Sequence, residues 1–175
     1  MKKLLALCLL AMTYHCLAAD IDPALKTKLD DRMKEVVAIA ADPRLVAAVK
    51  AHNAEPANAD MTQEKWAATS ALESTVRNLT KTIAAEVLKE KRSDAVTEAF
   101  VSGADGTKVG FLSKPTNWSH KGKAKHDVPM SGKTWQGPIE KDESTGFEQV
   151  QLAAPILDGG KPIGSLVVGY SINRL

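Results

Sequence analysis

The chain has 175 residues, of which 23 are basic and 21 are acidic, and its formal net charge is +2. A charge so close to zero gives no reason to expect nucleic-acid binding, and this length predicts one domain with a single hydrophobic core. The sequence has two cysteines, which excludes a disulfide-rich scaffold.

The first 19 residues have the pattern of a bacterial export signal. Lys2 and Lys3 precede an apolar run from residue 4 to residue 12, and Ala18 and Ala19 provide the small residues of a cleavage site. The apolar run is too short to span a bilayer. Both cysteines lie in this segment, so cleavage after residue 18 or 19 would leave no thiol and 21 residues of each charge. We therefore expect a periplasmic chain, residues 20–175, without disulfides or thiolate metal sites.

Residues 20–92 form the predicted helical part of the domain. Asp22-Pro23 combines a capping side chain with proline at the first helical position, and Asp42-Pro43 repeats this signal. Apolar residues recur at spacings of three and four from Leu25 to residue 40. A long first helix is expected, followed by a second helical piece that starts at the proline.

A second long helix is predicted behind the polar loop of residues 53–60. Asp60 and Gln63 form a variant of the capping box, and an apolar stripe runs from Trp66 to Val87 at helical spacing. We expect the two long helices to pack against each other along part of their length.

Residues 93–175 form the predicted sheet part. Alternating residues from 96 to 101, the turn Asp105-Gly106 and the apolar pair Val109 and Phe111 predict two strands joined by a tight turn. Residues 114–132 are predicted to be a long irregular loop, and residues 134–139 a third strand.

The last 29 residues predict a closing β-hairpin. Two largely apolar stretches flank Asp158-Gly159-Gly160, and the second stretch is rich in β-branched residues, as in a buried strand. Five strands after two helices predict an α+β fold, with long N-terminal helices packed against a five-stranded antiparallel sheet.

Four segments, taken in order, resemble one family. Residues 41–49 (ADPRLVAAV), 101–106 (VSGADG) and 142–146 (DESTG) and the hairpin ending in PIGSLVVGYSI are similar to corresponding segments of Cache domains, the PAS-like extracytoplasmic sensor modules of bacterial receptors. The resemblance implies a long helix beside a curved PAS-like sheet. It also implies a small-ligand pocket between this sheet and the loops that cover it.

The same resemblance implies extracytoplasmic sensing of a metabolite, either a carboxylate or an amine. A membrane helix follows this hairpin in such receptors, whereas the sequence stops at Leu175. We therefore expect a sensor that passes ligand occupancy to a separate membrane-bound signalling protein. The alternative is an interaction protein that keeps the fold without the ligand and forms a homodimer through its first helix. No arginine occurs from residue 93 to residue 173, which argues against the amino-acid clamp of double Cache domains.

The segment from Trp118 to Trp135 is the best candidate for ligand recognition. It combines indole rings, histidines and lysines, the mixture of apolar walls and convergent polar groups that a pocket needs. Lys133 and Trp135 are two apart in a predicted strand and should face one side, where the ammonium would meet an anion. Asp142 beside Ser144 would instead receive an amine. The predicted ligand-binding residues are Phe111, Trp118, His126, Lys133, Trp135, Asp142 and Ser144.

The remaining polar residues predict neither catalysis nor a metal site. The sequence contains no nucleophile elbow, phosphate loop or zinc-binding helix motif. His120 and His126 are six residues apart, which is not a recognised zinc spacing, so we interpret them as surface or pocket histidines. Lys121, Lys123 and Lys125 are interpreted as solubilising loop residues. We expect no enzymatic activity and no cofactor.

Overall fold

A computed structural model describes residues 22–56, 58–141 and 148–175. The predicted export signal and the candidate residues Asp142 and Ser144 lie outside these ranges. Within them, no helix combines the length and the apolar composition that crossing a membrane requires.

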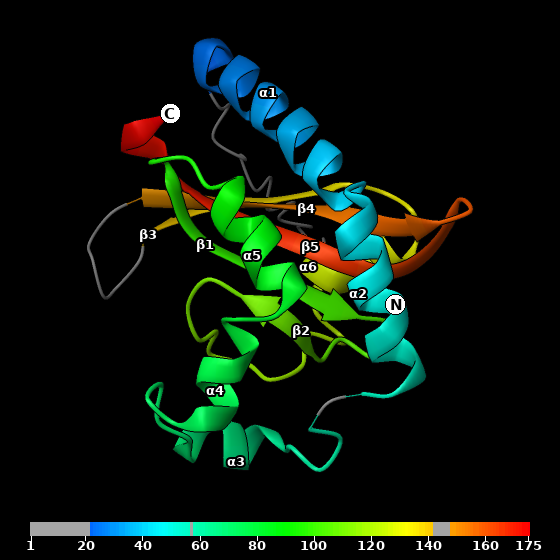
Figure 1. Ribbon diagram of the computed structural model, residues 1–175. Helices are drawn as coiled ribbons and strands as arrows, with labels where there is room; N and C mark the ends of the chain where they lie inside the picture. Colours follow the sequence, from blue (N-terminus) through cyan, green and yellow to red (C-terminus); the bar gives the residue numbers. More distant parts are fainter. Residues whose placement is uncertain (1–21, 57, 142–147) are drawn as a thin grey trace, which may run out of the picture.

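Five strands form one sheet in the order β2-β1-β5-β4-β3 (Figure 1). Every neighbouring pair is antiparallel. The predicted α+β class and the five-stranded antiparallel PAS-like sheet are confirmed. The strands are β1 (Val96–Gly103), β2 (Lys108–Phe111), β3 (Trp135–Lys141), β4 (Glu148–Asp158) and β5 (Lys161–Ser171), and the short 3-10 helix η1 (Ile172–Arg174) follows.

The predicted closing hairpin is the β4–β5 pair. It turns at Gly159 and Gly160, whose φ angles of 57° and 84° are left-handed values that glycine adopts without strain. β5 lies at the centre of the sheet, because it pairs with β1 on one side and with β4 on the other.

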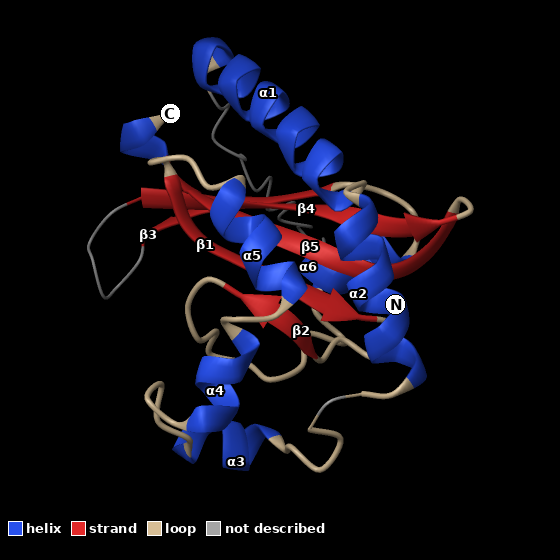
Figure 2. Cartoon of the chain, in the orientation of Figure 1, coloured by secondary structure: helices blue, strands red, loops and turns tan. Residues whose placement is uncertain are grey.

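Helices α1 (Pro23–Ala40), α2 (Pro43–Ala54) and α5 (Ile83–Glu90) lie over one face of the sheet (Figures 1 and 2). The predicted caps of the first two helices are present. The carboxylate of Asp22 accepts a hydrogen bond from the backbone N–H of Leu25, and that of Asp42 accepts one from the N–H of Arg44. Arg44 also pairs with Glu90, which ties α2 to the end of α5.

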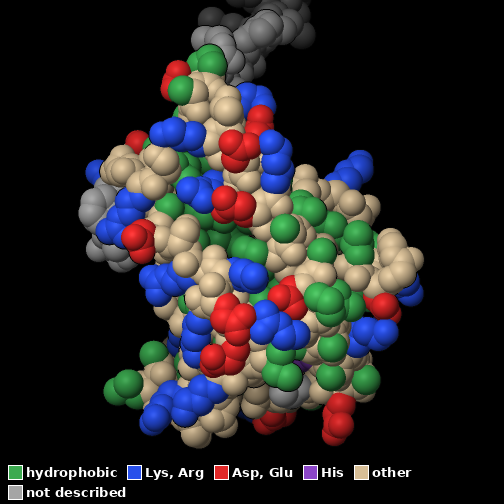
Figure 3. Space-filling model, turned by 45° about the horizontal axis from the view of Figure 1, so that its top comes forward, with side chains coloured by type: hydrophobic (Ala, Val, Ile, Leu, Met, Phe, Trp, Pro, Cys, Tyr) green, Lys and Arg blue, Asp and Glu red, His purple; other side chains and the backbone are tan. Residues whose placement is uncertain are grey.

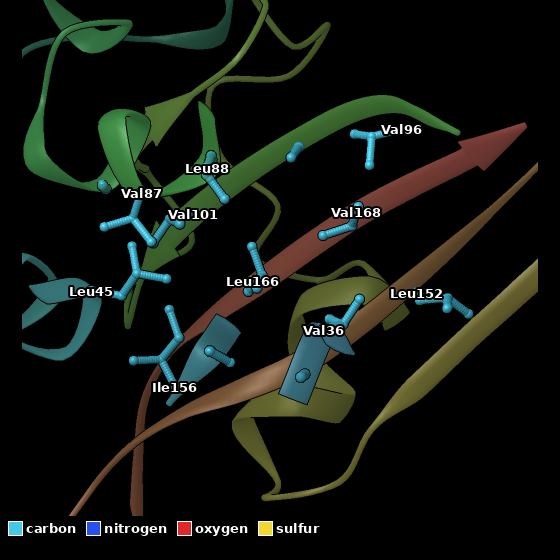
Figure 4. Packing of buried hydrophobic residues seen from close by; sticks show 14 of the residues in the cluster. Val36, Leu45, Val87, Leu88, Val96, Val101, Leu152, Ile156, Leu166 and Val168 are labelled. Carbon is cyan, nitrogen blue, oxygen red and sulfur yellow. The ribbon is translucent and has the colours of Figure 1, made fainter. Parts of the chain in front are cut away.

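The main core lies between these three helices and the sheet. Figure 4 shows Val36, Leu45 and Val87 from the helices pointing toward Ile156 and Leu166 on the strands, and all five side chains are fully buried. Burial of each such side chain stabilises the fold by about 1.5–3 kcal/mol.

The prediction of a second long helix is wrong. The stretch divides into α3 (Gln63–Ala68), α4 (Ser74–Leu79) and α5, and the cap of α3 is Thr62 rather than Asp60. Hydroxyl side chains compete with the helix for backbone groups: Thr69 Oγ1 donates to a carbonyl of the preceding turn, and Thr82 Oγ1 accepts from the backbone N–H of Ala85. The breaks rotate the stripe, so that Leu72 is 83% exposed.

The predicted irregular loop of residues 114–132 contains a short helix, α6 (Ala124–Met130). Gly122 and Gly132 flank this helix with φ angles of 83°. Helix α6 packs against β4 and β5 on the sheet face opposite α1, behind the sheet in Figure 1. The sequence pattern did not indicate α6, because seven residues with a proline inside give no readable helical period.

The outer surface of α1 carries charges of both signs (Figure 3). Lys26 pairs with Asp30, and Lys34 pairs with Asp31, as expected for an exposed helix face. The inner surface of α1 is attached to the end of β5, since the guanidinium of Arg32 lies 5.9 Å from the centre of the Tyr170 ring. In addition, Lys28 Nζ donates to the backbone carbonyl of Leu175 at 2.8 Å.

Two neighbouring valines test how α1 packs. Val36 is fully buried, whereas Val37 is 43% exposed. Val36→Ala is expected to lower the free energy of unfolding by roughly 2 kcal/mol, because it removes two buried carbons and leaves a cavity. Val37→Ala changes the same atoms at an exposed position, and denaturant unfolding should show a change below about 0.5 kcal/mol. Equal effects of the two substitutions would contradict the packing of α1 on the sheet.

Candidate functional site

A pocket of about 440 Å³ lies on the sheet face opposite α1. Its walls come from β1, from β4, from the loop that follows β2 and from α6. On the strands, lining residues such as Phe100 and Gln151 alternate with residues such as Val101 and Leu152 that face the main core. The lining consists of Thr97, Glu98, Phe100, Ser113, Lys114, Pro115, Thr116, Asn117, His120, Lys125, Gln149 and Gln151.

A glycine of the central strand makes room for a hydrogen bond between two residues of the pocket lining. Gly169 of β5 pairs with Glu98 on β1 and with Gln151 on β4. A Cβ at position 169 would lie 2.7 Å from Thr97 Oγ1 and 2.8 Å from Glu98 Cγ. Because glycine has no side chain, Gln151 Nε2 can reach across it and donate a hydrogen bond to Glu98 Oε1.

The loop wall of the pocket is held in place by an aromatic cluster. Trp66 of α3 is fully buried. Its ring centre lies 5.1 Å from that of Trp118, with an angle of 43° between the planes, and it makes an edge contact with Phe111. Trp66 Nε1 donates to the carbonyl of Pro115 at 2.8 Å, and Lys114 Nζ donates to the carbonyl of Trp66 at the same distance. These bonds fix residues 114–118 against α3 and so define one side of the pocket.

A lysine without an ion-pair partner among the described residues lies beneath the pocket. Val109 is the extra residue of a bulge between β1 and β2, so that Lys108 points to the same face as Phe111. Lys108 is fully buried, and its Nζ lies 2.7 Å from His120 Nδ1, 3.2 Å from the carbonyl of Gly106 and 3.3 Å from Ser102 Oγ. Burial, the largest cause, lowers the pKa of Lys108 to about 7.

His120 connects this lysine with the pocket. Its ring stacks on Phe100 with a centre-to-centre distance of 4.7 Å and an angle of 13° between the planes. Both rings line the pocket. Burial, together with the positive charge of Lys108, lowers the pKa of His120 to about 3, so its imidazole is neutral at physiological pH.

Lys125 of α6 brings an unpaired positive charge into the described part of the pocket lining. It is half-buried and makes no hydrogen bond or ion pair with any residue in the described ranges. Burial lowers the pKa of Lys125, and the carboxylates of Glu98 and Glu140 oppose this effect. Such an ammonium is destabilised by lost hydration, and an anion bound beside it would compensate for that loss.

The sequence-predicted site residues are only partly brought together. Phe111 and Trp118 share the aromatic cluster under the loop wall, and the half-buried Trp135 packs against the same cluster. His126 is buried, and its Nδ1 lies 2.8 Å from Ser165 Oγ. These four residues lie outside the pocket lining, and their role as ligand contacts stays a prediction.

The spacing predicts that Lys133 and Trp135 share one face of a strand, but the structure does not place both residues in a strand. Strand β3 begins at Trp135, so Lys133 precedes it, and its side chain is exposed. The two acidic-turn candidates, Asp142 and Ser144, lie outside the described residues. Whether Lys133, Asp142 and Ser144 contact a ligand therefore also stays a prediction.

Sequence reasoning missed Lys108, Lys125 and Glu98. No residue type in the sequence indicates that Lys108 is buried, because its direction depends on the bulge at Val109. The sequence pattern places Lys125 in a solubilising loop, because it does not indicate helix α6. Among the described residues, no group of three or more histidine, cysteine or acidic side chains is arranged to hold a metal ion.

The buried Lys108 ammonium makes a testable contribution to stability. In the native state its pKa is lowered to about 7, whereas an unfolded lysine titrates near ~10.4. The cost of burying the charge is therefore complete below about pH 7 and disappears as the pH rises toward about 10. Subtracting the unfolding free energy of Lys108→Met from that of the wild type should give a difference that rises over this interval in favour of the wild type. A difference that is independent of pH would show that the ammonium is not desolvated.

The sequence matches no protein-family model and no curated protein. Among solved structures, the sensor domain of the V. cholerae histidine kinase DctB is similar, with a TM-score of 0.51 and 12% identity over 86% of this chain and 54% of that one. Also similar is the ligand-binding domain of the P. aeruginosa amino-acid chemoreceptor PctC in complex with GABA, with a TM-score of 0.48 and 13% identity over 86% of this chain and 56% of that one. The sensory domain of the C. jejuni chemoreceptor Tlp3 with isoleucine bound has a TM-score of 0.42 and 18% identity, over 86% of this chain and 64% of that one.

These similarities concern the fold. The chain spans about half the length of the DctB sensor domain, and the identity is too low to carry residues across. The chain has the fold of the Cache-type sensor domains, as the resemblance of its sequence segments predicts.

Proposed function

We propose that this chain is a periplasmic ligand-binding sensor domain whose pocket takes a small polar anion, such as a carboxylate metabolite. The observation that carries the proposal is the half-buried ammonium of Lys125, which lines the pocket without a partner among the described residues. Ligand occupancy would be passed to a separate membrane-bound signalling protein. The location rests on the export pattern of residues 1–19.

The charges of the pocket favour an anion over an amine. Lys114 and Lys125 contribute two positive charges, and Glu98 contributes one negative charge that already accepts a hydrogen bond from Gln151. His120 is neutral because its pKa is lowered to about 3. The described lining therefore carries an excess of one positive charge, and its volume of about 440 Å³ lies within the range of small-ligand sites.

The fold supports a binding role in the same position. The sheet, the covering loop and α6 provide the lining of the pocket on the face opposite α1, and the resemblance implies a ligand site between the sheet and its covering loops. The polar lining, with amide groups from Gln149 and Gln151, suits a hydrated metabolite better than an apolar one.

A ligand screen with two lysine variants tests the proposal. Thermal-shift and calorimetric titrations of mono- and dicarboxylates, inorganic phosphate and matched amines should give binding by anions alone. Lys125→Gln is expected to weaken anion binding roughly ten- to a hundredfold, because it removes a charge-assisted hydrogen bond. Lys121→Gln alters an exposed lysine of the same segment and should bind as the wild type does.

Two results of this screen would contradict the proposal. Stabilisation by amines rather than anions would reverse the charge assignment of the pocket. No stabilisation by any of these compounds would contradict ligand sensing, since a ligand that binds the native state must raise its stability. The alternative of an interaction protein would then be favoured.

A further inference from the structure

The two nitrogens of the His120 ring have different surroundings. Nδ1 lies 2.7 Å from Nζ of Lys108, while Nε2 has no hydrogen-bond partner among the described residues. Within the described ranges, Ser93 Oγ is the side-chain polar atom that is both buried and unpartnered. Nε2 therefore reaches open space, and the pocket is the space that the His120 ring lines.

The lysine decides which nitrogen carries the proton. An ammonium has three N–H donors and no acceptor, and Lys108 has three acceptors in reach: His120 Nδ1, Ser102 Oγ and the carbonyl of Gly106. The Phe100 ring lies 5.0 Å below the ammonium and stacks on His120, which holds both groups in place. Because Nδ1 must accept from the ammonium, the single proton of the neutral ring is placed on Nε2.

We propose that His120 is a specificity-determining residue of the pocket, a hydrogen-bond donor that Lys108 orients toward an anionic ligand. The inference rests on the proposed function and deepens it, because it adds a second group that selects for an anion. One oxygen of a carboxylate would accept from Nε2–H of His120, while the ammonium of Lys125 neutralises the charge. An amine would meet a donor at His120 and would not be bound there.

The donor depends on the protonation of Lys108. As a neutral amine, Lys108 can accept a hydrogen bond from Nδ1–H, so both tautomers of His120 become available and the donor is no longer imposed. Burial and the charge of Lys125 favour the neutral amine, while Asp105 favours the ammonium. His120 and His126 add no charge near neutral pH, because burial lowers the pKa of both. Anion affinity should therefore fall as the pH rises through about 7.

The tautomer can be measured without any ligand. In ¹⁵N-edited NMR spectra of the wild-type protein at pH 6, His120 should be neutral, with its proton on Nε2 and with Nδ1 showing the shift of a hydrogen-bonded acceptor. This measurement needs no substitution, so it does not depend on the folding of a variant. A proton on Nδ1 at pH 6, or a charged ring, would overturn the inference.

Two substitutions of His120 separate its two nitrogens in a binding experiment. In His120→Asn the Oδ1 atom can still accept from Lys108, but nothing reaches the pocket, so the affinity for acetate as the minimal carboxylate should fall about tenfold or more. His120→Gln places an amide donor near the position of Nε2, and its affinity for acetate should lie within about threefold of the wild type. Methylammonium is the matched cation and should bind to none of the three proteins.

The outcomes distinguish the inference from the proposed function. If acetate binds to the wild type and to His120→Asn equally well, His120 is not a ligand donor and the inference fails alone. If no anion binds to the wild type, the proposed function fails, and the ligand role of His120 fails with it. A loss of acetate binding in His120→Asn that His120→Gln restores supports the inference, since a merely structural role would not distinguish these two amides.

Discussion

The central position of β5 is the constraint on which the rest of the structure depends. It pairs with β1 and β4 along most of its length. One face of β5 contacts the main core, and the other contacts the aromatic cluster. Leu166 and Val168 point to the helices and fill the main core. Toward the other face, Val167 packs into the aromatic cluster, and Gly169 leaves room for the hydrogen bond between Gln151 and Glu98, which line the pocket. One strand thus closes the main core on one side and supports the aromatic cluster and the pocket-lining strands on the other.

The pocket is a polar hollow above an apolar support. Trp66, Trp118 and Phe111 form that support, and Trp66 fixes the loop by donating a hydrogen bond to the carbonyl of Pro115. The residues that line the pocket lie nearer to solvent than this cluster, and their charged groups retain part of their hydration. Lys108 differs from these charged residues, because it lies outside the lining and is fully buried. It is held by neutral acceptors and an aromatic ring rather than by a carboxylate in the described part of the chain.

The fold could be predicted from the sequence wherever the local signals and the tertiary packing agree. The capping residues Asp22 and Asp42 and the two-glycine turn of the last hairpin are such signals, and they locate α1, α2, β4 and β5. The apolar stripe from Trp66 to Val87 predicts one long helix, which is wrong. Its periodicity continues across breaks in the helix that hydroxyl side chains cause. Helix α6 is too short for any periodicity to be read.

The site was less predictable, for two physical reasons. Tryptophans attract attention as ligand contacts, yet their large apolar area is also what a core demands, and Trp118 is 4% exposed in the aromatic cluster. The direction of Lys108 depends on a bulge at Val109 that reverses the alternation of β2, and no residue type in the sequence marks that bulge.

The contact between α1 and the end of β5 lies next to strand residues that pair with the pocket lining. Gly169 pairs with Glu98 and Gln151, which line the pocket, and the next residue, Tyr170, holds Arg32 of α1 against its ring on the opposite side of the sheet. Successive residues of a strand face opposite ways, so this short segment of β5 contacts elements on both sides of the sheet. The end of β5 is therefore a point of contact that the first helix and the pocket lining share.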